Sequence, residues 1–145
     1  MDRFKGKTCI VTGSGGSIGR ATALRLASEG GRIVGCDVKA EPSEETVRQV
    51  KAAGGEMIAL HRCDLTRKED CDRLVAAALD HYGGIDVLFN NGAMAYFGWI
   101  DDPSDENWFR TINEELNLVY LMTRAAWPAL SRVGGVIVNN ASMAA

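Results

Sequence analysis

Short apolar runs of strand length alternate along the whole chain with longer stretches in which apolar residues recur at the helical spacing. This alternation is typical of a parallel α/β sheet. It predicts strands at residues 7–12, 32–37, 56–61, 85–90 and 135–140. Helices are expected between them, at 17–30, 42–53, 67–82 and 105–131, the last of which is open to a break.

The order of the strands follows from the handedness of their connections. Crossovers between parallel strands are almost always right-handed, so the strands should lie in the order 3-2-1-4-5, with a ligand site above strands 1 and 4. Gly30-Gly31 and Gly54-Gly55 should end the first two helices in the left-handed conformation. The sequence stops at Ala145, directly after the fifth strand. We therefore expect an incomplete α/β domain over residues 1–145, truncated after that strand.

Composition narrows the function classes. The chain has 145 residues, 46% hydrophobic and 24% charged, with a formal net charge of -3, which fits one soluble domain. Its basic residues are scattered, which argues against nucleic-acid binding. No apolar run reaches membrane length and no signal peptide precedes the first strand, so a cytoplasmic protein is expected. Four cysteines without metal-site spacing predict no metal and are interpreted as buried apolar residues.

A glycine-rich segment, Thr12 to Gly19, joins the first strand to the first helix. Glycines let the backbone approach a pyrophosphate, and the helix N-terminus stabilises its charge. An acid, Asp37, stands at the end of the second strand, at the spacing expected of a residue that accepts hydrogen bonds from the adenosine ribose. Its charge would repel the 2′-phosphate of NADP, which favours NAD, although Lys39 could soften the preference. The alternative is that Asp37 only caps a turn.

These motifs resemble the short-chain dehydrogenase/reductase superfamily. The loop is similar to the family's T-G-x-x-x-G-x-G, with Ser17 at the middle glycine, and it also fits the T-G-x-x-G-x-x-G of the extended branch. Asn90-Asn91-Gly92-Ala93 is similar to the N-N-A-G of the compact, NAD-dependent branch, with the last two residues exchanged. The resemblance implies a Rossmann-type three-layer α/β/α fold and these cofactor-binding residues: Gly13, Ser14, Gly16, Ser17, Ile18, Gly19, Asp37, Asp64, Leu65, Asn91, Gly92 and Ala93.

Some of these roles have alternatives. The resemblance places Asp64 and Leu65 beside the adenine ring, but Asp64 could instead be the N-cap of a helix that begins near Thr66 or Arg67. In the family Asn90 lies by the cofactor ribose and residues 91–93 pass beneath it. The alternative is a turn of turn-prone residues.

The resemblance also assigns catalytic positions. Residues 137–142 are similar to the family's fifth strand and its I-V-N-x-S-S segment, which makes Ser142 the serine that orients the substrate oxygen. Glu115 occupies the position of the family's proton-relay asparagine. Asn113 and Asn117 flank it, and Glu115 could equally be a solvated helix residue.

The function implied is hydride transfer between NAD and an alcohol/ketone substrate by an oxidoreductase that forms a homo-oligomer at full length. No Y-x-x-x-K follows Ser142, so the catalytic Tyr and Lys are absent and the 145-residue chain should be inactive by itself. The alternatives are a non-catalytic NAD-binding protein (a pseudo-dehydrogenase) and an extended-type epimerase. Met94, Tyr96, Phe97 and Trp99 form either an apolar wall of the cleft or part of its packing.

Overall fold

The computed structural model describes residues 2–101 and 105–142. Its described part contains one parallel sheet in the order β3-β2-β1-β4-β5. The strands are β1 (Thr8–Thr12), β2 (Arg32–Asp37), β3 (Glu56–His61), β4 (Val87–Asn90) and β5 (Val136–Asn139). The predicted order is confirmed, and each strand lies within two residues of its predicted bounds.

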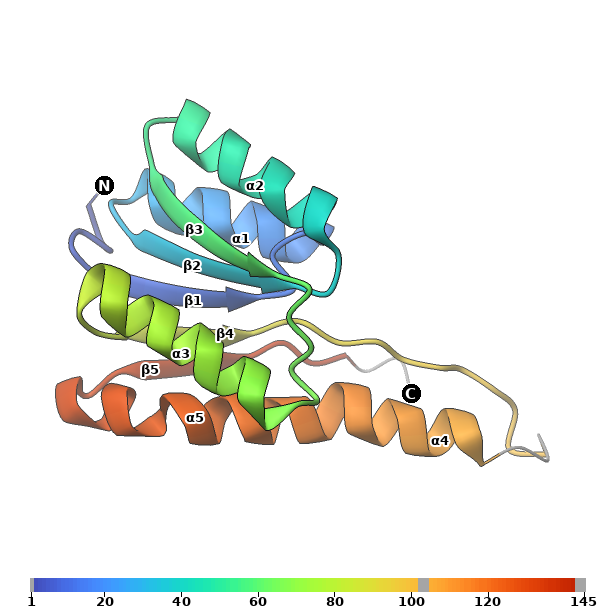
Figure 1. Ribbon diagram of the computed structural model, residues 1–145. Coiled ribbons are helices and arrows are strands. Elements are labelled where there is room, and N and C mark those ends of the chain that lie inside the picture. The colour runs from blue at the N-terminus through green and yellow to red at the C-terminus, as the bar shows by residue number, and fades with distance from the viewer. Residues whose placement is uncertain (1, 102–104, 143–145) are drawn as a thin grey trace.

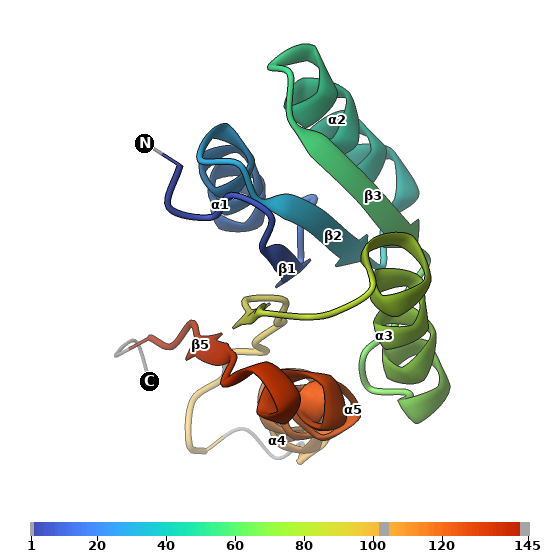
Figure 2. The same cartoon turned by 90° about the vertical axis from the view of Figure 1, so that its left-hand side faces the viewer.

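Helices cover the sheet on both faces (Figures 1 and 2). They are α1 (Ser17–Ser28), α2 (Ala40–Ala52), α3 (Lys68–Tyr82), α4 (Glu106–Thr111), the π-helix η1 (Ile112–Asn117) and α5 (Leu118–Val133). Figure 2 shows α1 and α2 on one face and α3, α4 and α5 on the other. The fold is therefore the three-layer Rossmann-type arrangement that the sequence predicts.

Each face has its own apolar core, because side chains alternate along buried strands. Cys9 and Val11 of β1 pack with Ala23, Ala27 and Val50 under α1 and α2. Ile10 of β1 points the other way and packs against side chains of α3 and α5, which include Leu74, Ala78, Met122, Ala126 and Leu130. The sheet is thus fixed from both sides at β1, the strand after which the glycine loop begins.

The helix ends agree with the glycine pattern. Gly30 has φ +87° and Gly54 has φ +81°, so both take the left-handed conformation just after a helix, as predicted. The start of α2 differs from the prediction, since it begins at Ala40 and Pro42 is its third residue. Proline is tolerated there because the first N–H groups of a helix have no partner within it.

The break expected in the last helix is a widened turn rather than a gap. Residues Ile112–Asn117 form a π-helix between α4 and α5, and Glu115 lies within it. In a π-helix the N–H groups bond five residues back, which adds a residue to the turn, and such turns are frequent at functional sites.

The two faces of β5 are not buried to the same extent. The side chains of Val136 and Val138 on β5 are 54% and 45% exposed, whereas Ile137 packs against the core on the α5 side. Within the described residues, no helix is both long and apolar enough to cross a membrane.

Candidate cofactor and substrate site

The glycine loop turns sharply at the carboxyl end of β1. Gly13 has φ +63°, and a Cβ atom there would lie 2.8 Å from Cα of Gly92 on the neighbouring loop. A Cβ atom at Gly19 would lie 2.1 Å from the carbonyl oxygen of Gly13, so a side chain has no room between the loop and α1. Both positions require glycine for close backbone approach, as a pyrophosphate-binding turn does.

Thr12 joins the glycine loop to the loop after β4. Its hydroxyl oxygen accepts hydrogen bonds from the N–H groups of Asn91 and Gly92, each at 2.8 Å, and donates to the carbonyl of Phe89 at 3.3 Å. The amide of Asn91 donates to the carbonyl of Thr12 at 3.0 Å. Residues 91 and 92 are therefore held against the start of the glycine loop, although they are far from it in sequence.

Asp37 lies at the end of β2 and bridges two turns. One carboxylate oxygen accepts from the N–H of Gly15 at 3.0 Å, and the other accepts from the N–H of Lys39 at 3.0 Å. The turn-capping role and the loop contact thus exist together. An ionised carboxylate has about four acceptor positions, so two remain for ribose hydroxyls.

Asp64 lies after β3 and shapes a turn before α3. Its carboxylate accepts from the N–H of Thr66 at 3.0 Å and from the Thr66 hydroxyl at 2.7 Å. The alternative prediction that Asp64 is the N-cap of a helix starting near Thr66 or Arg67 is wrong, since α3 begins at Lys68 and its N-cap is Arg67. The Asx turn takes up the bonds that a cap would have made.

The carboxylate of Asp70 stabilises this turn. Its carboxylate accepts the N–H of Asp64 at 2.8 Å and pairs with Arg73 at 2.6 Å. The hydrogen bond from the Asp64 backbone, aided by the charge of Arg73, lowers the pKa of Asp70. Asp70 belongs to none of the sequence motifs.

A cleft of about 580 Å³ opens between these loops. Of the residues predicted to bind the cofactor, it is lined by Gly13, Gly16, Asp37, Asp64, Leu65, Asn91, Gly92 and Ala93. Ser14 is buried and does not line the cleft: its hydroxyl is bonded to the carbonyl of Cys36 and to Ser43, its N–H donates to the carbonyl of Cys36, and its carbonyl accepts from the Thr46 hydroxyl. Ser17, Ile18 and Gly19 begin α1 and do not line the cleft; Ile18 is exposed and Gly19 is buried.

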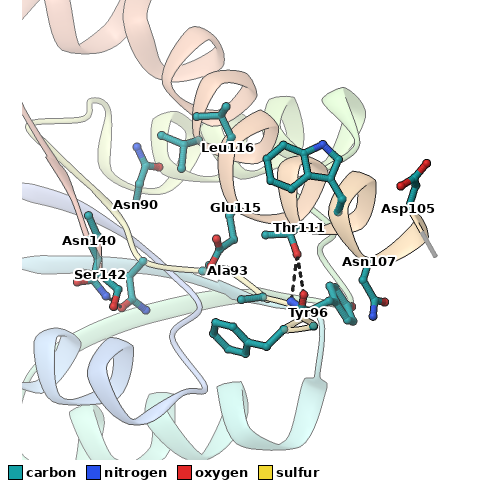
Figure 3. Close-up of a pocket in the computed structure, with 18 of the residues that line it drawn as sticks. Asn90, Ala93, Tyr96, Asp105, Asn107, Thr111, Glu115, Leu116, Asn140 and Ser142 are labelled. Carbon is teal, nitrogen blue, oxygen red and sulfur yellow. Dashed lines mark hydrogen bonds between the residues drawn. The ribbon is translucent and has the colours of Figure 1, made fainter. Parts of the chain in front are cut away.

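A second cavity of about 1140 Å³ continues from the cleft and shares Asn91, Gly92, Ala93 and Tyr96 with it. Figure 3 shows Ser142 and Asn140 entering from the segment after β5, while Glu115 descends from the helix towards Ala93. Both predicted catalytic residues, Ser142 and Glu115, thus line this cavity. Their side of the site is distinct from the glycine loop.

Tyr96 fixes the boundary between the two cavities. Its hydroxyl donates to Glu114 at 2.8 Å and accepts from Arg110 at 2.5 Å, and the Arg110 guanidinium lies 3.9 Å from the ring centre. Its backbone N–H donates to the Thr111 hydroxyl at 3.1 Å. The hydrogen bond with Glu114 raises the pKa of Tyr96, which does not suit an acid/base tyrosine that must ionise readily.

Asn90 lines the larger cavity and is almost fully buried at its wall. Its amide nitrogen donates to Asn139 at 2.9 Å and to the Thr123 hydroxyl at 3.2 Å. Its amide oxygen has no partner among the described residues. Asn90 therefore ties β4 to β5 and α5, beneath the ribose position that the resemblance implies.

Several residues that line the two cavities were not among the predicted site residues. Gly15, Cys36, Cys63, Thr66, Glu114 and Leu118 border the cleft, and Trp108, Asn107 and Thr111 border the cavity. Gly15, Cys36, Cys63, Thr66 and Glu114 lie next to predicted site residues along the chain, so adjacency could have found them. The others, which are Leu118, Trp108, Asn107 and Thr111, reach the site by packing between distant segments and carry no local signal.

Comparison with known proteins decides the family. A family model described as short chain dehydrogenase matches residues 7–145. The chain belongs to this family. It is 34% identical to a cyclohexanol dehydrogenase of Acinetobacter sp. strain SE19 over 99% of the chain and 57% of that protein. It is 33% identical to a 3beta-hydroxysteroid dehydrogenase of Mediterraneibacter gnavus over 99% of the chain and 52% of that protein.

A solved structure shows the same likeness. A metagenomic short-chain oxidoreductase, described in complex with NADP, has a TM-score of 0.89 and 32% identity over 97% of this chain and 64% of its own. This short-chain dehydrogenase chain thus spans only part of the length of each of these three relatives.

Proposed function

We propose that this chain carries the NAD-binding half of an oxidoreductase that transfers a hydride between a nicotinamide cofactor and an alcohol or ketone. The observation that carries the proposal is the cleft at the carboxyl ends of β1 and β2, where Gly13 and Gly19 leave no room for side chains and Asp37 faces the glycine loop. Bound there, NAD would supply or accept the hydride, and its nicotinamide would extend towards the larger cavity.

The choice of NAD over NADP rests on Asp37. Its carboxylate keeps acceptor positions free for two ribose hydroxyls, and its charge opposes a 2′-phosphate. The related metagenomic oxidoreductase is described in complex with NADP, so the preference of this chain has to come from its own residues, and Asp37 is the one we propose decides it. Lys39 follows two residues later and supplies the nearest opposing charge along the chain.

On the substrate side we propose that Ser142 holds the reacting oxygen and that Glu115 takes the place of a proton-relay residue. Both line the larger cavity, with the 91–93 loop between it and the cleft. Two relatives are named for cyclohexanol and for a 3β-hydroxysteroid, both secondary alcohols on a ring. The aromatic wall of Phe97, Trp99 and Trp108 suits the apolar part of such a substrate.

We also propose an oligomeric state and a cellular location for the whole protein. The whole protein is expected to be a homo-oligomer and to act in the cytoplasm. Its reducing conditions suit the four cysteines, none of which is in a disulfide.

Calorimetric titration with NAD and with NADP tests the cofactor assignment without requiring turnover. We expect NAD to bind more tightly to the wild-type chain, and Asp37→Asn to lose about tenfold or more in NAD affinity while losing little for NADP, since one charge-assisted hydrogen bond contributes about 1.5–3 kcal/mol. Asp80→Asn, on the exposed face of α3, is the matched control and should bind both as the wild type does. Equal affinities of wild type and Asp37→Asn for NAD would contradict the role of Asp37.

A negative result for both dinucleotides would remove the proposed function. Tight NAD binding by this chain, together with a natural protein of 15.6 kDa, would instead favour a non-catalytic NAD-binding protein. The intact mass of the protein purified from its own cells distinguishes the oxidoreductase from the non-catalytic NAD-binding protein.

A further inference from the structure

Two cysteine side chains border the Asp37 end of the cleft, although no motif includes them. Cys36 is the residue before Asp37 in β2, and Cys63 follows the end of β3 by two residues. The N–H of Cys63 donates to the carbonyl of Asp37 at 3.0 Å, which holds it beside the end of β2. Both side chains are buried in the apolar cluster on the α3 side of the sheet. The fold thus brings two buried cysteines together beside the Asp37 end of the cleft.

The other two cysteines do not share this position. Cys71 lies in the same cluster, but its thiol donates to the carbonyl of Leu65 at 3.4 Å and it does not border the cleft. Cys9 packs on the opposite face of the sheet. Burial raises the pKa of each of these thiols to about 12, so neither is suited to make the first attack on an oxidant.

Cys36 and Cys63 differ in reactivity because they interact with one another. The hydrogen bond from the Cys36 thiol lowers the pKa of Cys63, and the same interaction raises the pKa of Cys36. Thiolate is the form that attacks an oxidant. Cys63 is therefore the attacking thiol and Cys36 the neighbour that can resolve the product.

The backbone beside Cys63 is under strain. Arg62 has φ +57°, the only positive φ of a non-glycine residue in the described part of the chain. A left-handed arginine costs free energy that a different path of the chain would release. Residue 63 can therefore move with less opposition than a residue inside β3.

We propose that Cys36 and Cys63 form an oxidisable thiol pair, and that their disulfide closes the Asp37 end of the cleft to an adenine dinucleotide. Drawing Cys63 towards β2 displaces Asp64 and Leu65, which follow it in the chain and line the same cleft. The identity of the excluded ligand rests on the proposed function; the thiol pair itself does not.

The chemistry needs an oxidant, for which hydrogen peroxide is small enough to reach buried thiols. The Cys63 thiolate attacks one peroxide oxygen, the O–O bond breaks, and hydroxide leaves as the sulfenic acid forms. The Cys36 sulfur then attacks the Cys63 sulfur, an S–S bond forms, and the S–O bond breaks to release water with the Cys36 proton. In balance, two thiols lose two electrons and two protons, and the peroxide becomes two waters. Thiols such as glutathione reverse the step by exchange.

Peptide mapping after mild peroxide treatment of the reduced 145-residue chain tests the pair directly. Free thiols are alkylated and the chain is digested with trypsin under non-reducing conditions. Trypsin separates the four cysteines into different peptides, with Cys36 in residues 33–39, Cys63 in 63–67 and Cys71 in 69–73. We expect a 33–39 to 63–67 crosslink to form before any product that involves Cys9 or Cys71. Saturating NAD should slow it, by about tenfold at a free concentration ten times its Kd.

Variants sharpen the result. Cys63→Ala should abolish the crosslink, Cys36→Ala should leave a dimedone-reactive sulfenic acid at Cys63, and Cys71→Ala is the control that should behave as the wild type does. The peptide map of the wild-type chain tests the thiol pair even if a variant with a buried substitution fails to fold.

The outcomes separate the two proposals. If calorimetry shows NAD binding but peroxide yields no Cys36–Cys63 crosslink, or NAD does not slow it, the thiol pair is overturned and the proposed function stands. If the crosslink forms in a chain that binds neither NAD nor NADP, the control of dinucleotide binding falls together with the proposed function.

Discussion

The cleft under the glycine loop and the cavity beside α4 share residues 91–93, but their walls are fixed to different degrees. In the cleft, side chains bond to backbone groups: Thr12 holds residues 91 and 92, and Asp37 holds Gly15 and Lys39. In the cavity, the side chains of Trp99 and Trp108 are 86% and 64% exposed. If the proposed function is correct, this contrast places the more rigid walls around the cofactor and the less rigid walls around an apolar substrate.

Thr12→Val should produce the largest effect, because it removes an acceptor at the junction of the two cavities. Valine keeps the shape of threonine but leaves the N–H groups of Asn91 and Gly92 unpaired, at about 1–3 kcal/mol each. We expect the free energy of unfolding, measured in urea, to fall by about 2–4 kcal/mol. Thr12→Ser keeps the hydroxyl and should lose less than half as much; equal losses would assign the effect to the methyl group.

Asp70→Asn tests whether Asp70 stabilises the turn that contains Asp64, because the contribution of its carboxylate to stability depends on pH. The folded chain holds the pKa of Asp70 below that of an ordinary aspartate. The carboxylate therefore contributes stability that is fully present above the unfolded pKa of about 3.9 and is lost as the pH falls through the lower folded value.

We expect Asp70→Asn to cost about 1 kcal/mol at neutral pH and to flatten the acid decline in unfolding free energy. Asp72→Asn, on the exposed side of α3, serves as the control and should keep the full decline. A decline of unchanged slope in Asp70→Asn would remove Asp70 from this account.

Tyr96→Phe should give the smallest change in stability of the three variants, because the hydroxyl bonds are near the surface and are screened by solvent. Its effect should appear in local opening, since the hydroxyl links the loop to both Glu114 and Arg110. Hydrogen exchange of the amides at 93–101 should speed up while those of β1 stay unchanged. Tyr120→Phe, an exposed residue of α5, should alter neither, and identical exchange in both variants would show that the hydroxyl is not an anchor.

The difference between the two cavities also explains what the sequence could predict. The strand order, the glycine loop and Asp37 follow from local pattern and short spacing, because each turn lies directly at a strand end. The bonds of Tyr96 to Arg110 and Glu114 and the contact of Cys63 with Cys36 join separate segments. Neither has a local signature. Asp70 reads as an ordinary acid in the first turn of a helix, and only the fold shows that it holds Asp64.

For the site residues too, the sequence identifies the residue but not the structure around it. Ser14 belongs to the predicted motif, but the residue that takes up its hydroxyl, Ser43, comes from α2 and reveals itself only in three dimensions. Glu115 could be placed by its match to the position of the family's proton-relay asparagine. The π-helix around it could not, because a turn with bonds five residues back has no residue pattern of its own.

The π-helix determines how α4 is rotated about the helix axis relative to α5. An α-helix advances by about 100° per residue, so the additional residue in Ile112–Asn117 rotates everything before it relative to everything after it. Loss of a single residue there would restore a regular helix and turn Trp108 and Thr111 away from the cavity, while α5 kept its packing on the sheet. Insertions and deletions in this turn would therefore reshape the wall of the larger cavity in one step and leave the cleft under the glycine loop intact.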